Sequence, residues 1–283
     1  MVLQLPRSTK PPVVTWQPLP DDFILPDEPV ENIEQPFLAA ALTDALGQAE
    51  LITPEMLIAA NFGIVANVNQ KTVVKAPDWV WVSQVFPISE GVIRRSYTPN
   101  LEGAPIGIVM EFLSESDSGE LSVRSTYPYG KLYFYEQIVR VPTYAVFDPV
   151  ALSLEVRRLQ ANGFYEVQNP DEQERFWIPE LNLFLGIWYG LRLGRRIHWL
   201  RWWDAAGNLL LWSAEKAEQE RQRAEQAQQQ AEQAQQQAEQ ERQRAEQERQ
   251  RAEQAQQQAE QERQRSQNLA AKLRELGIDP TQI

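Results

Sequence analysis

Two carboxylates and one lysine are the residues of this sequence whose surroundings indicate chemistry. Asp78 follows Pro77 at the start of the apolar run "PDWVWV", and Glu111 lies inside the run "PIGIVMEFLS" (105–114). An ionised carboxylate inside a buried strand is costly unless a cation, a metal or hydrogen-bond donors compensate it. Glu111 therefore either lies at a solvent-facing end of its strand or is held in place for chemistry.

If the two strands are neighbours, Asp78 and Glu111 meet at one edge of a sheet and can bind a divalent cation. Oxygen ligands favour a hard cation such as Mg²⁺, which polarises a phosphodiester and activates water. A lysine commonly orients that water or stabilises the developing charge. Lys131 is the candidate, since Leu113 occupies the position two residues after Glu111. The predicted catalytic residues are thus Asp78, Glu111 and Lys131, with the two acids as metal ligands.

A purely structural role competes with this interpretation. A Pro-Asp pair is common at the start of a strand, and a single buried glutamate usually belongs to an ion pair. The candidate partners of Glu111 in such a pair are Arg94, Arg95 and Lys75. On spacing alone, the structural ion pair is the favoured explanation.

The composition excludes several classes of site. The chain has no cysteine, so disulfides, thiolate zinc sites and a cysteine nucleophile are ruled out. Its one histidine, His198, lies in the tryptophan-rich segment "RRIHWLRWW", where a structural role is expected. The net charge of −12 argues against extensive non-specific binding of nucleic acid, although it permits a small local site.

Targeting and membrane segments are not apparent. The N-terminus "MVLQLPRSTKPPVV" lacks the apolar stretch of a signal peptide. No apolar run reaches the roughly 18 residues of a membrane span. We therefore predict a cytoplasmic protein with no membrane partner.

The 283 residues divide into three predicted regions. Residues 1–36 are rich in proline and acidic residues and predict an extended arm, residues 37–213 an α/β domain, and residues 214–283 a helical tail. Helical spacing predicts a first helix over 35–51 and a second, short one starting near Thr53 and Pro54.

Strand-like runs dominate the α/β domain. They cover residues 72–85, 105–114, 143–149, 153–160 and 163–168, with a helix-like segment at 127–141. This order is typical of an α/β fold with at least one crossover between strands. A hairpin turning at "DAAGN" (204–208) is predicted to close the domain, with the nearby tryptophans in its core.

Seven consecutive heptads, each beginning with alanine, occupy residues 217–265. Alanine, glutamate, glutamine and arginine are good helix formers, so one long helix is predicted. The seam would be small and partly polar, whereas a coiled coil prefers larger apolar residues. A solvated single helix and an alanine-based coiled coil that joins two copies both remain open, as does docking or dimerisation through "NLAAKLRELGIDP" (268–280).

A set of ordered motifs adds a family resemblance. The segments "VVKAPDWVWV", "IVMEFLSES", "YGKLYFYEQIVRVPTYAVFDP" and "LEVRRLQANGFYEV", in this order, resemble the restriction endonuclease-like Uma-two family, which is expanded in cyanobacteria. That family belongs to the PD-(D/E)XK nuclease superfamily. The resemblance covers roughly residues 35–212 and implies a restriction-endonuclease-like mixed sheet flanked by helices. It also implies that the motif acids are Asp78 and Glu111.

The sequence departs from the superfamily pattern at the usual lysine position. The expected E-x-K is Glu111-Phe112-Leu113 here, so Lys131 would have to supply the lysine. Glu50 is the loose candidate for a glutamate that many members carry on their first helix.

Two functions from different classes follow. The first is a Mg²⁺-dependent endonuclease that hydrolyses DNA phosphodiesters at Asp78, Glu111 and Lys131. The second is a nuclease-fold binding or scaffold protein with impaired catalysis, whose helical tail associates with itself or with partners. The first function requires a metal ion bound at Asp78 and Glu111, whereas the second does not. Hydrolysis of another phosphate ester on the same scaffold is a third, more distant possibility.

Overall fold

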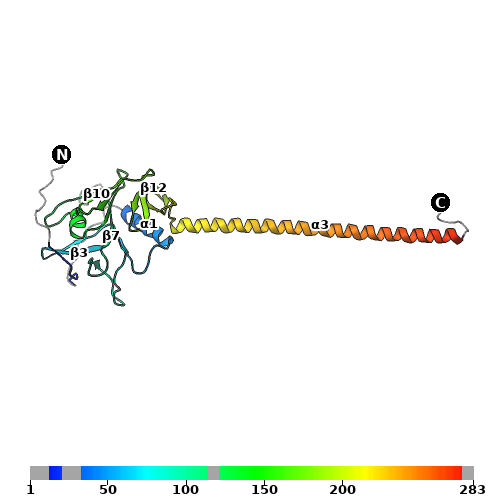
Figure 1. The fold of residues 1–283 in the computed structure, drawn as a ribbon, viewed down its shortest axis with the longest axis horizontal. Coiled ribbons are helices and arrows are strands. Elements are labelled where there is room, and N and C mark those ends of the chain that lie inside the picture. Colours follow the sequence, from blue (N-terminus) through cyan, green and yellow to red (C-terminus); the bar gives the residue numbers. More distant parts are fainter. Residues whose placement is uncertain (1–12, 21–32, 114–120, 276–283) are drawn as a thin grey trace. The chain divides into compact units, whose positions relative to one another are not determined.

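The computed structural model describes residues 13–20, 33–113 and 121–275 of the chain. The chain divides into two compact units, residues 1–216 and residues 217–283. The first unit is a mixed α/β domain and the second belongs to a long helix (Figure 1). The prediction of an α/β fold followed by a long C-terminal helix is confirmed.

A six-stranded sheet forms the centre of the first unit, in the order β10-β9-β8-β7-β5-β2. Its strands are β2 (Leu57–Ala59), β5 (Trp79–Val82), β7 (Ile106–Phe112), β8 (Thr143–Asp148), β9 (Ser153–Leu159) and β10 (Tyr165–Val167). All neighbours are antiparallel except β7 and β8, which are parallel. Parallel neighbours need a crossover connection. That connection contains α2 (Lys131–Tyr133) and the π-helical turn η1 (Phe134–Ile138), which together form a helical segment within the predicted range.

Both faces of the central sheet are buried. Along β7, Ile108, Met110 and Phe112 join one hydrophobic core, whereas Val109 joins the other. This alternation follows from the two-residue period of a strand. Glu111 shares the Val109 face, which explains why its run of neighbours is apolar on both sides.

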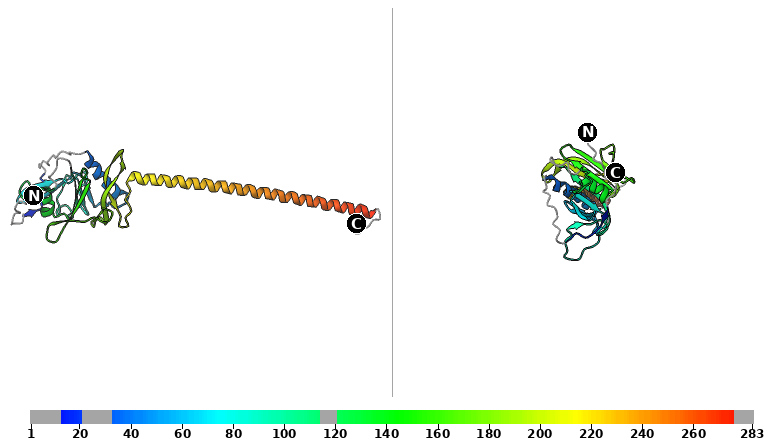
Figure 2. Two further views of the ribbon diagram at one scale, coloured as in Figure 1. Left: turned by 90° about the horizontal axis from the view of Figure 1, so that it is seen from above. Right: turned by 90° about the vertical axis from the view of Figure 1, so that its left-hand side faces the viewer.

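One face of the central sheet packs against α1 (Glu34–Gln48) and a three-stranded sheet, as Figures 1 and 2 show. The strands of that sheet are β11 (Phe176–Ile178), β12 (Leu183–Arg192) and β13 (Arg195–Trp203). The helix predicted over 35–51 is α1, and its buried residues include Leu38, Leu42 and Leu46. Several of the tryptophans predicted to be in the core are fully or almost fully buried: Trp199, Trp202 and Trp212.

The other face packs against the crossover segment and a second sheet. Its strands are β1 (Val14–Thr15), β3 (Gly63–Val68), β4 (Lys71–Lys75) and β6 (Ser96–Tyr97). Of the predicted N-terminal arm, the structure describes residues 13–20, which contain β1 and Trp16, and residues 33–36, where α1 begins at Glu34. Residues 1–12 and 21–32 lie outside the described residues.

The short helix predicted near Thr53 is wrong. Strands β2 and β3 occupy the segment, and every residue of β3 is buried. A two-residue turn at Asn69 and Gln70, both with positive φ (49° and 67°), leads from β3 into β4. This backbone conformation suits a tight hairpin, and burial on both faces hid the alternation that would have identified the strands.

Two strand boundaries also differ from the prediction. The run 72–85 is not one strand, because β4 ends before Pro77 and β5 then enters a different sheet. The closing hairpin is formed by β12 and β13, which turn at Leu193 and Gly194. The "DAAGN" turn exists, held by Asp204, but is followed only by one isolated bridge, Trp203 to Leu209.

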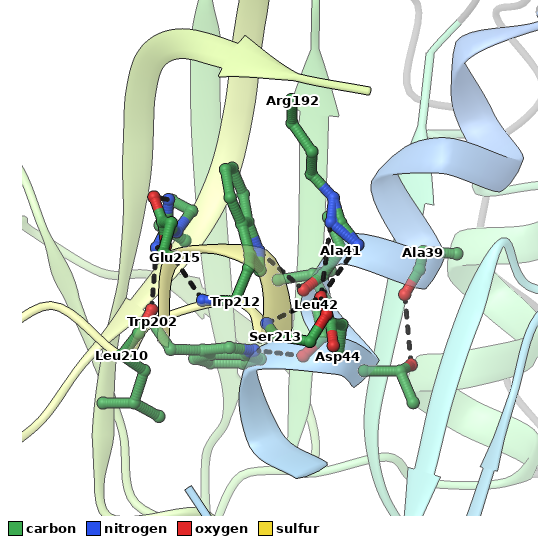
Figure 3. A network of polar contacts seen from close by, with 12 residues as sticks. Ala39, Ala41, Leu42, Asp44, Arg192, Trp202, Leu210, Trp212, Ser213 and Glu215 are labelled. Atoms are coloured by element: carbon green, nitrogen blue, oxygen red, sulfur yellow. Dashed lines mark hydrogen bonds and ion pairs between the residues drawn. The ribbon is translucent and has the colours of Figure 1, made fainter. Parts of the chain in front are cut away.

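A buried guanidinium ties the first turn of α3 (Ser213–Glu275) to β13. Arg201 is fully buried and donates from both terminal nitrogens to Glu215, at 3.1 and 2.7 Å. It also donates to the Leu210 carbonyl, and its Cζ lies 3.4 Å from the centre of the Trp212 ring. The Trp212 backbone N–H donates to Glu215 in turn (Figure 3).

A second carboxylate links the same turn to α1. Asp44 accepts hydrogen bonds from Arg192 at 2.9 Å and from the Ser213 hydroxyl at 3.2 Å (Figure 3). The indole of Trp202 donates to the Leu42 carbonyl, and that of Trp212 to the Ala41 carbonyl. The start of α3, up to Lys216, is therefore part of the folded domain.

From residue 217 onward the side chains of α3 are almost all exposed. The heptad segment is one continuous helix, and the separate short helix predicted after it is a continuation of α3 up to Glu275. Ion pairs between Arg221 and both Glu218 and Glu225 lie on its surface. Among the described residues, no helix combines the length and apolarity that crossing a membrane requires.

Candidate active site

The three residues singled out in the sequence meet at one end of β5 and β7. Asp78 directly precedes β5, Glu111 is the second-last residue of β7, and Lys131 is the first residue of α2. The antiparallel register pairs Trp79 with Met110, and continuing it by one residue places Asp78 opposite Glu111. The condition on which the predicted site depended, that the two strands are neighbours, is met.

Glu111 is completely buried, yet both of its carboxylate oxygens have partners from the crossover segment. The Lys131 ammonium lies 3.2 Å from Oε2, and the Tyr135 hydroxyl donates to Oε1 at 3.0 Å. Residues four apart lie on the same face of a helix, so one helical turn presents both donors. The structure thus identifies Lys131 as an ion-pair partner of Glu111, whereas Arg94 pairs with Glu102.

A backbone hydrogen bond fixes Asp78 to the neighbouring strand. The Phe112 N–H donates to Asp78 Oδ2 at 2.6 Å. The carbonyl of the same residue accepts a 2.7 Å hydrogen bond from the Gln35 side chain near the start of α1. The peptide groups on either side of Phe112 are therefore held in place, which sets the position of Glu111 relative to Asp78.

The local electrostatics keep Tyr135 protonated. Burial, followed by the nearby carboxylate of Glu111, raises the pKa of Tyr135 well above its usual value, and Tyr144 and Asp78 add to the effect. A hydroxyl that keeps its proton remains a hydrogen-bond donor to Glu111. Two carboxylates and one ammonium thus meet at this end of the two strands.

The residues present fit a hard divalent cation with few protein ligands. Among the residues that the structure describes, no group of three or more histidine, cysteine or acidic side chains is placed to hold a metal ion. Asp78 and Glu111 would supply two carboxylates, leaving the other positions to water and substrate oxygens. Mg²⁺ is usually bound in this way, through one or two carboxylates and several waters.

Sequence reasoning missed two residues of this site. Tyr135 lies four residues after Lys131 in a helical segment, and that spacing was the available signal. Gln35 reaches Phe112 from 77 residues away, so no local pattern could have found it. Glu50, the candidate for the glutamate on the first helix, does not lie on that helix. It follows the C-terminal end of α1, whereas Gln35 lies near the start, and it is exposed with a φ of 59°.

Other candidates have structural partners. His198 packs against the Tyr189 ring, with their centres 4.7 Å apart.

Comparison with known proteins agrees with the geometry. Residues 24–194 match the Uma2 family, whose description is "Putative restriction endonuclease". No curated protein matches the chain. The matched segment includes Asp78, Glu111 and Lys131, and it covers more than half of the sequence. The chain therefore belongs to the Uma2 family of restriction endonuclease-like proteins.

Proposed function

We propose that this protein is a metal-dependent endonuclease that hydrolyses DNA phosphodiester bonds. The observation that supports this most strongly is the meeting of Asp78, Glu111 and Lys131 from three separate elements at one sheet edge. Membership of a family described by restriction endonuclease activity agrees with DNA as the substrate.

The proposed roles follow from the contacts. Asp78 and Glu111 would hold Mg²⁺, which when bound polarises the phosphodiester and lowers the pKa of a bound water. Tyr135 and the Asp78–Phe112 hydrogen bond keep the two carboxylates in position. Lys131, within 3.2 Å of Glu111, is placed to orient the attacking water or to stabilise charge that develops on the phosphate.

The lysine of the proposed site comes from a different position in the chain than in the usual motif. Leu113 stands where the E-x-K lysine is expected, and Lys131 brings its ammonium to Glu111 from the crossover segment. The missing lysine of the E-x-K motif is the main argument for impaired catalysis, and the contact between Lys131 and Glu111 weakens that argument. It also leaves a structural ion pair as the rival explanation of Glu111, with Lys131 as the partner.

Cleavage of supercoiled plasmid by the full chain tests the proposal. Wild type, Asp78→Asn, Glu111→Gln and Lys131→Met are compared with Mg²⁺, with Mn²⁺ and with a chelator. We expect metal-dependent nicking by wild type and a loss of roughly 100-fold or more in each variant.

Glu136→Gln is the matched control for these substitutions. Glu136 is another buried carboxylate on the crossover segment, but it accepts hydrogen bonds from the Tyr165 N–H and the Gln137 side chain. This variant should cleave like wild type. Inert wild-type protein would contradict the proposal and favour the binding or scaffold function. Glu111→Gln with wild-type activity would contradict the proposed role of Glu111.

Association and location stay predictions from the sequence. The exposed face of α3 is available for a homo-oligomer, which analytical ultracentrifugation of the full chain would detect as a mass above one copy. A cytoplasmic location is likewise a proposal that fractionation of cells would test.

A further inference from the structure

Three tyrosines adjoin Lys131 and form a continuous aromatic cluster. The rings of Tyr129 and Tyr133 are stacked, with centres 5.8 Å apart and planes 15° from parallel. Tyr127 meets Tyr129 edge-on at 6.3 Å. Tyr129 precedes Lys131 by two residues and Tyr133 follows it by two, so the cluster lies on the segment that carries the lysine of the proposed site.

The outermost ring of this cluster is open to solvent and carries a cation. Tyr127 is 54% exposed, and the Lys71 ammonium on β4 lies 4.8 Å from the centre of its ring. Arg124 donates to the Tyr127 carbonyl at 3.2 Å, which adds a second positive charge beside the ring. Lys71 and Arg124 thus bring positive charge to Tyr127 on a chain with a net charge of −12.

The segment that carries Tyr127 is held firmly against α2. The Gly130 N–H donates to the Arg124 carbonyl at 2.9 Å, and the Tyr133 N–H donates to the Ser122 carbonyl at 3.3 Å. A side chain added at Gly130 would collide with the Ser122 carbonyl, at 2.2 Å. The exposed ring is therefore presented by a loop with fixed backbone geometry.

An exposed aromatic ring beside cations is the combination that binds unpaired nucleic acid. Bases stack on the ring, and lysine or arginine neutralises the phosphates. In a duplex the faces of the bases are covered by their neighbours, so such a ring adds little to duplex binding. Unpaired DNA therefore fits this surface better than duplex DNA.

We propose that Tyr127 and Lys71 bind an unpaired base and its phosphate on the strand that enters the Asp78–Glu111 site, so that the preferred substrate is single-stranded or locally unpaired DNA. This inference rests on the proposed nuclease function, because it takes the bound strand to continue from the Asp78–Glu111 site past Lys131 onto Tyr127. It specifies the substrate class of that site.

Binding of labelled oligonucleotides in a chelator tests the inference without any cleavage. Fluorescence anisotropy compares one single-stranded DNA with its duplex, using the full chain as wild type, Tyr127→Ala, Tyr127→Phe and Lys71→Gln. For single-stranded DNA we expect Tyr127→Ala to weaken binding by roughly tenfold to a hundredfold. Tyr127→Phe keeps the ring and should bind within about twofold of wild type.

Tyr189→Ala is the matched control, since Tyr189 is 55% exposed and lies on β12. It should leave DNA binding unchanged. The inference is overturned if Tyr127→Ala binds single-stranded DNA like wild type, if Tyr127→Phe is as weak as Tyr127→Ala, or if duplex binding falls equally. An RNA strand of the same sequence that alone shows the Tyr127 dependence would overturn the assignment to DNA.

A parallel cleavage assay separates this inference from the proposed function. If wild type cleaves single-stranded DNA faster than duplex and Tyr127→Ala loses that preference, both are supported. If no substrate is cleaved in Mg²⁺ or Mn²⁺ but Tyr127→Ala still loses affinity for single strands, the nuclease proposal fails and the binding surface stands.

Discussion

Two clusters of buried charge in this protein contain similar side chains arranged in different ways. At the base of α3, Arg201 donates to both oxygens of Glu215, which also accepts a backbone N–H, and the Trp212 ring covers the guanidinium. At the end of β7, Glu111 faces the single ammonium of Lys131 and the hydroxyl of Tyr135, with a second carboxylate, Asp78, opposite it.

The difference lies in the balance of charge. The Arg201–Glu215 pair is neutral, and its bidentate geometry and backbone contacts are typical of a link between elements. The Asp78–Glu111–Lys131 cluster instead brings two carboxylates together beside one lysine, at the end of two neighbouring strands. Burial of a charge is therefore weak evidence of chemistry, whereas two carboxylates opposite each other on neighbouring strands are stronger evidence. Substitutions in the first cluster should reduce stability, and those in the second should reduce activity.

The largest expected effect is on stability, at Arg201. Arg201→Met leaves Glu215 without its buried partner, and removing one member of a buried pair lowers the free energy of unfolding by about 3–5 kcal/mol. Urea unfolding measures the change. Arg221→Met, which breaks bidentate contacts to Glu218 on the exposed surface of α3, is the control and should leave the free energy of unfolding nearly unchanged. Equal losses of stability in Arg201→Met and Arg221→Met would show that the buried pair stabilises the domain no more than a surface ion pair does.

The next effect is on activity, at Lys131. Lys131→Met keeps most of the aliphatic stem but removes the charge at Glu111, and we expect single-turnover cleavage to slow by roughly 100- to 1,000-fold. Stability should fall as well, because Lys131→Met leaves the fully buried Glu111 without its ammonium partner. Unchanged cleavage in a folded Lys131→Met protein would make the lysine a structural partner only.

A smaller effect, dependent on pH, is expected at Tyr135. Tyr135→Phe leaves a buried oxygen of Glu111 without its donor and should lower the free energy of unfolding by about 1–3 kcal/mol at pH 8. Because the pKa of Tyr135 is raised in the folded protein, the unfolded chain binds fewer protons above pH about 10, and wild-type stability falls as pH rises. The gap between wild type and Tyr135→Phe should therefore narrow from pH 9 to pH 11, as urea unfolding at each pH would show. A constant gap would contradict the raised pKa.

The smallest change in the free energy of unfolding is expected when the tail is removed after Lys216. A chain ending at Lys216 retains Glu215 and should unfold within about 0.5 kcal/mol of wild type, since the residues beyond are exposed. A chain ending at Ala214 loses the partner of Arg201 and should be measurably less stable. Thermal melts of the two truncations give the comparison, and a collapsed melt in the first would show that the heptads support the domain.

The sequence predicted β7 and β8 better than it predicted the segments before them. Glu111 stood out because it interrupts an apolar run, and Asp78 because it opens one. The predicted single strand over 72–85 failed at Pro77, which lacks a backbone N–H and ends the ladder there. The helix predicted near Thr53 failed because β3 is buried on both faces and shows no alternation.

Contacts between distant segments could not be predicted from local patterns. Composition places the start of the tail near residue 214, yet Ser213 and Glu215 are joined to α1 and β13 by side-chain contacts. The position of Gln35 beside Phe112 likewise depends on how α1 packs on the central sheet. Both contacts are set by packing between elements, which the spacing of residues in the sequence does not reveal.

Calorimetric titration with Mn²⁺ tests the central claim, that Asp78 and Glu111 share a divalent cation, most directly. It compares the full chain as wild type, Glu111→Gln and the control Glu136→Gln. We expect one binding event in wild type and in Glu136→Gln, and its loss in Glu111→Gln while the protein remains folded. Equal binding in all three proteins, or no binding in wild type, would exclude a shared cation and leave Glu111 as the buried partner of Lys131.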